Sequence, residues 1–136
     1  MKDINTYLVF DGNCREAMTF YKQCLQGELF IMPFSEAPIE MAARGAGDRI
    51  MHASLKAGSG VLMASDSMPD MPVRQGDNFS ISLNCESLEE TDRLFNALAD
   101  KGHIKMPLQQ TFWATRFGML TDRFGINWMF NFEQPK

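Results

Sequence analysis

The order of predicted elements in the first half of the chain recurs in the second half. In each half, period-two alternation predicts a strand, apolar residues at helical spacing predict one helix, and three more alternating segments predict strands. The predicted strands cover residues 4–10, 28–34, 50–56, 61–66, 79–85, 103–109, 114–120 and 126–132. Asn13 and the Ser87 capping box are expected to start the helices, and Gly27 and Gly102 to close them about 75 residues apart. The sequence therefore predicts an α+β fold of two βαβββ modules.

The length and composition suit a single domain that contains both modules. Hydrophobic residues make up 45% of the 136 residues, which is enough to build a core. We expect module 1 at about residues 1–66, a Pro- and Gly-containing linker at 67–78, and module 2 at about 79–136. Residues 35–49 are rich in Pro, Gly and Ala and lack any period, so they predict a mobile loop over one rim.

The charge and targeting signals exclude several partners. Thirteen basic and seventeen acidic residues give a net charge of −4, so the chain lacks the excess of positive charge that binds nucleic acid or anionic lipid. The first ten residues lack the basic flank, apolar stretch and small-residue cleavage site of a signal peptide, and no apolar run has the length of a membrane span. Three cysteines without a C-x-x-C motif favour reduced thiols. We therefore expect a cytoplasmic protein with no nucleic-acid or membrane partner.

Alternation within the strands separates core residues from residues that could line a cavity. Trp128, Phe130 and Phe132 share one face of the last predicted strand and are expected to pack under a helix. The opposite faces of the first and last strands of each half combine polar and soft apolar side chains, namely Asn5, Tyr7, Val9, Met63, Ser65, Ser80, Ser82, Asn127, Met129 and Asn131. Such a set is typical of a small-molecule pocket or of a hydrated sheet face.

Three segments carry a resemblance to a known family. LVFDGNCREAMTFY near the start, VLMASDSMP before the linker, and QQTFWATRFGMLTDRFGINWMFN near the end closely resemble the PhnB-like branch of the vicinal-oxygen-chelate superfamily. This superfamily also contains glyoxalase I, bleomycin-resistance proteins and extradiol dioxygenases. The resemblance spans essentially the whole chain. It implies that the modules form a curled mixed sheet around a central cavity, often in a homodimer.

Enzymes of this superfamily typically hold a divalent metal through His and Glu on the first and last strand of each module. By strand register, these positions fall at about Asn5, Met63, Ser80 and Met129. A slip of one residue in either direction offers only Ile4, Thr6, Leu62, Ala64, Phe79, Ile81, Trp128 or Phe130. None of these side chains suits a hard or borderline divalent cation. We therefore expect no metal at this position.

Related chains are sometimes labelled demethylubiquinone methyltransferases, but the sequence gives that activity no support. It has no glycine-rich loop between a strand and a helix of a Rossmann-type unit, and it is too short for that fold. We therefore expect no cofactor.

A few single residues have both a functional and a structural interpretation. His52 could act as a general base or bind a ligand, or it could support the sheet. Phe112 and Trp113 could close a pocket over a flat ligand, or pack against the neighbouring module. Cys14 at a helix N-terminus could be a reactive thiol, although its helical stripe favours core packing. Asp122 is expected to bind backbone amides in the last turn.

The sequence thus favours a metal-free, dimeric protein that binds an unknown small molecule. The expected ligand-binding residues are Asn5, Tyr7, His52, Met63, Ser65, Ser80, Phe112, Trp113, Met129 and Asn131. One alternative is a metal-dependent lyase, isomerase or dioxygenase with displaced ligands, such as His52 with Glu133 or Asp66. Another is an antibiotic-sequestering resistance protein, which would need a large acidic groove at a dimer interface. Catalytic residues are not identified.

Overall fold

The chain forms two compact units, each with its own sheet and helix. The computed structural model describes residues 1–38 and 47–134. Unit 1 comprises Met1–Arg74 and unit 2 comprises Gln75–Lys136, so the boundary falls within residues 67–78.

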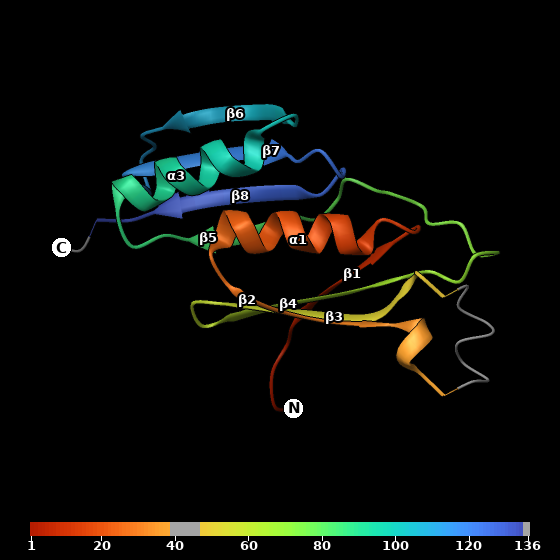
Figure 1. The fold of residues 1–136 in the computed structure, drawn as a ribbon. Coiled ribbons are helices and arrows are strands. Elements are labelled where there is room, and N and C mark those ends of the chain that lie inside the picture. The colour runs from red at the N-terminus through yellow and green to blue at the C-terminus, as the bar shows by residue number, and fades with distance from the viewer. Residues whose placement is uncertain (39–46, 135–136) are drawn as a thin grey trace. The chain divides into compact units, whose positions relative to one another are not determined.

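Unit 1 is one βαβββ module. Its strands follow the sheet order β1-β4-β3-β2, in which β1 runs parallel to β4 and the other neighbours are antiparallel. Helix α1 covers one face of this sheet (Figure 1). The elements are β1 (Thr6–Phe10), α1 (Cys14–Leu25), β2 (Glu28–Pro33), the 3₁₀ turn η1 (Phe34–Glu36), β3 (Ile50–Ala57) and β4 (Gly60–Asp66).

Unit 2 repeats the same arrangement. Its sheet order is β5-β8-β7-β6, with β5 parallel to β8, and helix α3 covers one face (Figure 1). The elements are β5 (Ile81–Asn84), α3 (Leu88–Ala99), β6 (His103–Gln109), β7 (Arg116–Thr121) and β8 (Asn127–Phe132). The predicted α+β fold of two βαβββ modules is confirmed.

The core of each unit lies between the helix and the sheet, as the alternation predicts. Trp128, Phe130 and Phe132 are buried in unit 2, as expected. The buried helical stripe consists of Cys14, Ala17, Met18, Tyr21 and Cys24 in α1, and of Thr91, Leu94, Phe95 and Leu98 in α3. Leu88 remains 38% exposed, because it occupies the first position of α3, beside the cap.

Each helix is followed by a residue with positive φ and then by a glycine, but the predicted role of these glycines is wrong. The residues with positive φ are Gln26 (55°) and Lys101 (60°), each one position before the glycine. A Cβ on Gly27 would lie 2.4 Å from the Lys56 carbonyl oxygen, and one on Gly102 would lie 2.5 Å from that of Thr121. Both glycines are therefore needed for close approach of the chain to a strand, and not for a left-handed φ.

The segment predicted as a mobile loop over residues 35–49 contains ordered structure at both ends. Ser35 and Glu36 belong to η1. The backbone N–H of Phe34 donates to the Arg49 carbonyl at 2.9 Å, and that of Ser35 donates to the Gly47 carbonyl at 3.2 Å. Residues 39–46 of this segment lie outside the described part of the chain.

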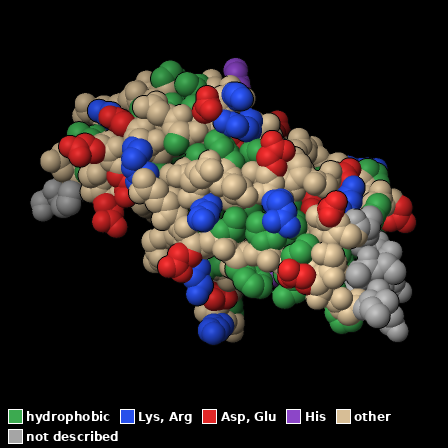
Figure 2. All heavy atoms as spheres, viewed as in Figure 1, with side chains coloured by type: hydrophobic (Ala, Val, Ile, Leu, Met, Phe, Trp, Pro, Cys, Tyr) green, Lys and Arg blue, Asp and Glu red, His purple; other side chains and the backbone are tan. Residues whose placement is uncertain are grey.

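In the described ranges, neither α1 nor α3 has the length and apolar character needed to cross a bilayer. On the face drawn in Figure 2, basic and acidic side chains are interspersed, with no continuous patch of one sign.

Candidate functional site

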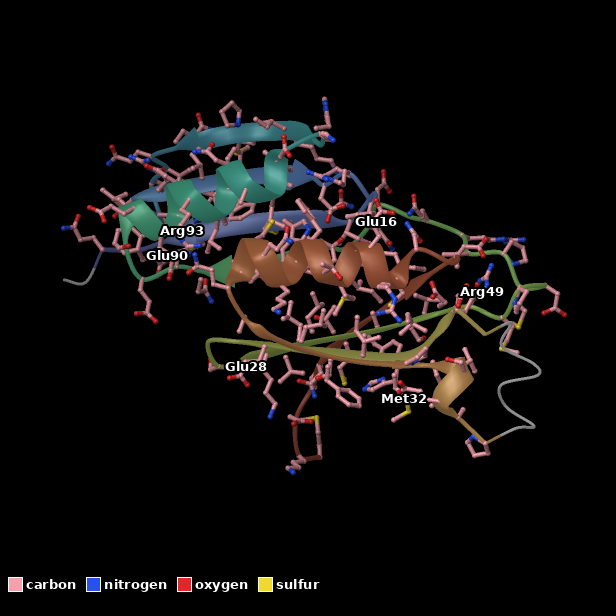
Figure 3. All side chains as sticks on the ribbon, in the orientation of Figure 1. Glu16, Glu28, Met32, Arg49, Glu90 and Arg93 are labelled. Atoms are coloured by element: carbon pink, nitrogen blue, oxygen red, sulfur yellow. The ribbon has the colours of Figure 1, made fainter. Side chains whose placement is uncertain are left out.

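The sheet of unit 1 has one face away from α1, which we call the first open face. Figure 3 shows Met32 of β2 on this side of the sheet. Strand register places Tyr7 opposite Met63, Met63 opposite Ser54, and Ser54 opposite Phe30, so these four side chains form one row across the sheet. Their partial exposure contrasts with the buried Leu8, Ala53, Leu55 and Ala64 on the alternate positions.

Tyr7 and His52 make a polar contact on the first open face. The Tyr7 hydroxyl lies 3.3 Å from Nδ1 of His52, and the two rings stack with centroids 5.9 Å apart and planes 28° from parallel. Because Nδ1 is engaged by Tyr7, Nε2 is the ring nitrogen through which His52 can exchange a hydrogen bond with a ligand. Of the expected ligand-binding residues, Tyr7, His52, Met63 and Ser65 come together here. Asn5 precedes β1, is exposed, and donates to the Asp3 carboxylate at 3.1 Å.

The corresponding face of unit 2, away from α3, is the second open face. Ser82 lies opposite Met129 and Met129 opposite Met119, which form one row. Asn84 lies opposite Asn131 and Asn131 opposite Phe117, which form the next row. Strand β7 contributes to this face as well. The alternation of Phe117, Met119 and Thr121 could have placed them on this face. Ser80 lies just before β5 and is partly exposed.

A turn before β7 presents two aromatic rings beside the second open face. The Thr111 N–H donates to the Ala114 carbonyl, and the Ala114 N–H donates to Thr111 Oγ1, both at 3.1 Å. Trp113 meets Phe117 edge to face with ring centroids 5.3 Å apart, and Phe112 meets Trp113 in the same way at 4.8 Å. Phe117 is only 7% exposed, whereas Phe112 is 98% exposed. Trp113 therefore packs on its own module, and Phe112 extends into solvent.

Asn127 was also expected on this face, but it is buried and serves a structural role. Its Oδ1 accepts from the Thr121 hydroxyl at 2.6 Å, and its Nδ2 donates to the Phe79 carbonyl at 3.3 Å. Phe79 precedes β5 and is exposed, contrary to the expectation that it begins the apolar face of that strand.

The positions that bind metal in superfamily enzymes do not fit a divalent cation here. Met63 lies on the last strand of module 1 opposite Tyr7, and Met129 lies on the last strand of module 2 opposite Ser82. Together with Asn5 and Ser80 they offer neutral thioether, amide and hydroxyl groups, whereas such cations are held by carboxylates, imidazoles or thiolates. Within residues 1–38 and 47–134, no group of three His, Cys, Asp or Glu side chains is placed to hold an ion.

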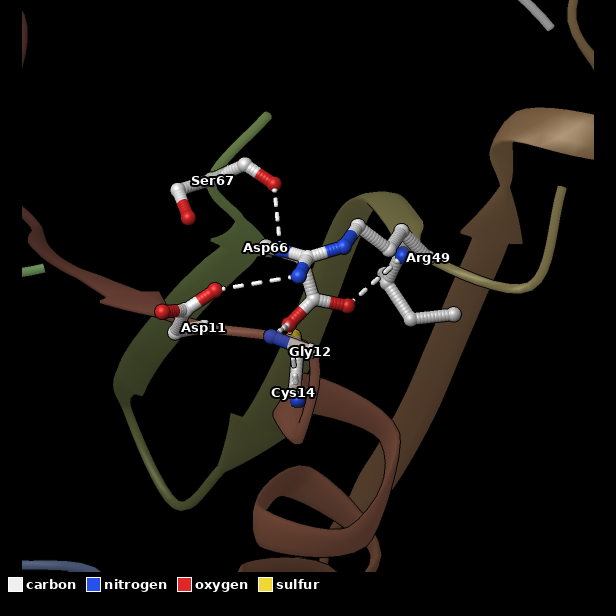
Figure 4. Close-up of polar contacts among 7 residues, drawn as sticks. Asp11, Gly12, Cys14, Arg49, Asp66 and Ser67 are labelled. Atoms are coloured by element: carbon white, nitrogen blue, oxygen red, sulfur yellow. Dashed lines mark hydrogen bonds and ion pairs between the residues drawn. The ribbon is translucent and has the colours of Figure 1, made fainter. Parts of the chain in front are cut away.

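Asp66 was expected as a possible acidic partner of His52, but its carboxylate accepts hydrogen bonds from backbone N–H groups on the other side of the sheet. Its Oδ1 accepts from the N–H groups of Gly12 at 2.8 Å and Cys14 at 3.0 Å, and its Oδ2 accepts from the N–H of Ile50 at 2.8 Å (Figure 4). Asp66 is buried with Leu62 and Ala64 on the α1 side of β4, whereas His52 lies on the first open face. The pairing of His52 with Asp66 is therefore wrong.

This arrangement also corrects the predicted cap of α1. Asn13 makes no side-chain capping bond, and the distant Asp66 binds the N–H groups at the helix start in its place. Arg49 supports the same region: its Nη1 donates to the Ser67 carbonyl at 2.8 Å and its Nη2 pairs with Asp11 at 3.0 Å (Figure 4).

The Cys14 thiol is buried beside this cap, and its surroundings disfavour the reactive thiolate. Burial, with the nearby Asp66 carboxylate as a second cause, raises the pKa of Cys14 from 9.0 to about 12. Burial also raises the pKa of Cys85. The interpretation of Cys14 as a reactive thiol is therefore wrong, and its assignment to the core is confirmed.

The expected role of Asp122 is confirmed. Its Oδ1 accepts from the N–H groups of Phe124 at 2.8 Å and Ile126 at 3.0 Å, and its Oδ2 accepts from Nε1 of Trp128 at 2.8 Å. This carboxylate fixes the β7–β8 turn and the largest core side chain.

Comparison with known proteins finds a matching family model and solved structures with the same fold. Residues 2–130 match the family model described as 3-demethylubiquinone-9 3-methyltransferase. The structure is similar to that of protein PA1353 from Pseudomonas aeruginosa, with 50% identity, a TM-score of 0.87, and coverage of 99% of this chain and 100% of that one. It is also similar to the PhnB protein from Bacillus cereus, with 30% identity, a TM-score of 0.80, and coverage of 96% and 99%.

A more distant match shows the wider fold. A glyoxalase/bleomycin resistance protein/dioxygenase family enzyme from Burkholderia phytofirmans has 14% identity and a TM-score of 0.65 over 95% of this chain and 98% of its own. At this identity the likeness concerns the fold alone. The chain shares its fold with the glyoxalase/bleomycin resistance/dioxygenase enzyme, and it belongs to the PhnB-like family described as 3-demethylubiquinone-9 3-methyltransferase.

Proposed function

We propose that this protein binds a small organic molecule on the open faces of its modules without a resident divalent cation. The observation that carries the proposal is the matched pair Met63 and Met129. These two residues hold equivalent positions on the last strand of each module, where superfamily enzymes place metal ligands. Thioethers there supply flexible, polarisable apolar contacts and bind hard or borderline cations poorly.

The neighbours of these methionines support binding of a neutral, mixed-polarity ligand. Tyr7, Ser54 and His52 surround Met63 on the first open face, and Ser82, Asn84 and Asn131 surround Met129 on the second. Small-molecule sites commonly combine apolar contact surface with a few hydrogen-bonding groups of this kind.

The methyl groups of the methionines provide a direct test. Protein labelled with ¹³C at the methionine methyls is treated with EDTA and titrated with a metabolite panel, with each resonance assigned by Met→Leu substitution. A saturable shift of Met63 or Met129, with buried Met18 unmoved as the internal control, is the expected result. Binding that requires an added divalent cation, or no shift on either face with any compound, contradicts the proposal.

A second candidate is acid–base catalysis by His52, which the Tyr7 contact favours because it orients the ring. Turnover of a bound compound, abolished in His52→Gln but with binding retained, would identify this activity. Binding without turnover leaves the first proposal in place. The methyl transfer named in the family description is not part of either proposal. In the described part of the chain, the turn from β1 into α1 contains one glycine, Gly12, and the turn from β5 into α3 contains none, so neither is a glycine-rich cofactor loop.

We also propose that the protein acts as a cytoplasmic homodimer. All three cysteines are free thiols, which suits a reducing compartment. Light scattering after size exclusion is expected to give twice the 15.4 kDa chain mass. A mass of one chain at micromolar concentration would overturn the dimer.

A further inference from the structure

We infer that the second open face selects a flat, aromatic ligand carrying a hydrogen-bond donor, which stacks at Trp113 and donates to Oδ1 of Asn131. This inference rests on the proposed binding function and deepens it by naming the ligand class. All of the residues involved belong to unit 2.

The aromatic part of the site is built by the turn before β7. Mutual hydrogen bonds between Thr111 and Ala114 hold the two tip residues, Phe112 and Trp113, in place. Trp113 is supported from one side by Phe117, yet it remains 47% exposed. An indole ring fixed in this way offers a preorganised surface to a flat apolar ring, because little side-chain entropy remains to be lost on binding.

The polar part of the site is Asn131, which lies directly opposite Phe117 in the β7–β8 register. Its Nδ2 donates to Oδ1 of Asn84 at 3.5 Å, whereas its own Oδ1 is buried and has no hydrogen-bond partner within residues 1–38 and 47–134. A buried acceptor without a partner retains the cost of its desolvation. Because this oxygen is buried, a ligand N–H or O–H group reaches it only when the side chains that cover it move, and the new hydrogen bond then removes that cost.

Neutral side chains of β5, β7 and β8 form the row next to this acceptor. Met129 and Met119 lie opposite each other in the adjacent row, next to Ser82. Such surroundings favour an uncharged ligand, because burying an unpaired ionic group beside thioethers would be unfavourable.

The test uses indole and 1-methylindole as matched probes, since they differ only in the N–H donor and the added methyl group. The ¹⁵N-labelled protein is titrated with each compound while the Nε1–H resonances of its two tryptophans are followed. Trp113 reports on the site, and buried Trp128, which donates to Asp122, is the internal control. Indole is expected to shift Trp113 and the Asn131 side-chain amide and to bind about three- to tenfold tighter than 1-methylindole.

Substitution of the acceptor provides the matched variants. In Asn131→Leu the preference for indole is expected to fall to about one, because only the apolar contacts remain. Asn131→Asp retains an acceptor oxygen and is expected to keep the preference. An unchanged Trp128 resonance verifies that each variant is folded. If either variant fails to fold, the affinities of the unaltered protein for the two compounds still show whether the ligand N–H contributes to binding.

Several outcomes overturn the inference, and they separate it from the proposed function. Equal or tighter binding of 1-methylindole would exclude the donor contact. Shifts confined to Tyr7, His52 and Met63 would preserve small-molecule binding but remove it from this site. A Trp113 shift that follows protein concentration alone would mean that a second copy of the chain covers the ring. The proposed function itself would be contradicted only if no compound of the metabolite panel shifted a resonance on either open face.

Discussion

The carboxylate of Asp66 accepts a hydrogen bond from the backbone N–H of Cys14 at 3.0 Å, across 52 residues of sequence. The last strand of module 1 thus caps the helix that follows its first strand. Since the same carboxylate also binds Gly12 and Ile50, one side chain fixes the start of α1 and the start of β3.

Asp66→Asn is expected to lower the free energy of unfolding by about 3 kcal/mol, because the new amide NH₂ faces backbone donors and the charge that favours a helix N-terminus is lost. Urea denaturation followed by circular dichroism measures the change. Asp11→Asn is the control, since its carboxylate is half-exposed and pairs with Arg49, so a loss of about 0.5 kcal/mol is expected. Equal losses in both variants would contradict the capping role.

Gly27 and Gly102 both lie against a strand carbonyl, so replacing either glycine is expected to destabilise the fold to a similar extent. Gly27→Ala and Gly102→Ala are each expected to destabilise by more than about 2 kcal/mol, because the new methyl group would overlap a strand carbonyl. Gly76→Ala is the matched control, since its Cβ would meet nothing closer than 3.8 Å. Thermal unfolding compares the three variants. If Gly102→Ala unfolded at the same temperature as Gly76→Ala, the close approach of Gly102 to the strand would be refuted.

The raised pKa of Cys14 predicts a thiol that resists alkylation. Treatment with N-ethylmaleimide at pH 8, followed by peptide mass spectrometry, is expected to leave Cys14 unmodified in the native protein and modified in urea. Because the unfolded thiol ionises near 9.0 and the folded one only at about 12, this group contributes stability below pH 9 that declines as the pH rises towards 12. Rapid native labelling of Cys14 would be inconsistent with its burial.

The Tyr7–His52 contact predicts a change in the tautomer balance of His52. In Tyr7→Phe the partner of Nδ1 is removed, so the two ring nitrogens are expected to shift in a long-range ¹H–¹⁵N spectrum, while exposed His103 remains unchanged. Identical His52 resonances in the two proteins would show that the hydroxyl does not set the tautomer.

The fold was predictable because the helix and strand periods agree with burial along most of the chain. Alternation placed Leu8, Phe10, Trp128 and Phe130 in the core, and helical spacing placed Ala17 and Tyr21 there. The turn roles of Asp122 and Ser87 followed from local chemistry, and both carry the expected bonds. These features depend on residues within a few positions of one another.

The features that sequence reasoning missed depend on distant residues. Asn13 is a good capping residue by type, but Asp66 reaches the helix start through the fold and replaces it. The contact of Tyr7 with His52 and the row from Asn84 through Asn131 to Phe117 depend on strand register, which alternation alone does not specify. Residue type and local period therefore identify which face is open, but not which side chains meet on it.

The central claim, that this protein binds ligands without a resident divalent cation, is tested most directly by elemental analysis. The chain is purified without chelator or affinity metal, and its transition-metal, calcium and magnesium contents are measured by mass spectrometry alongside its melting temperature before and after EDTA. We predict contents far below one equivalent and no change in melting temperature. One equivalent per chain, lost in Met63→Ala or Met129→Ala, would contradict the account.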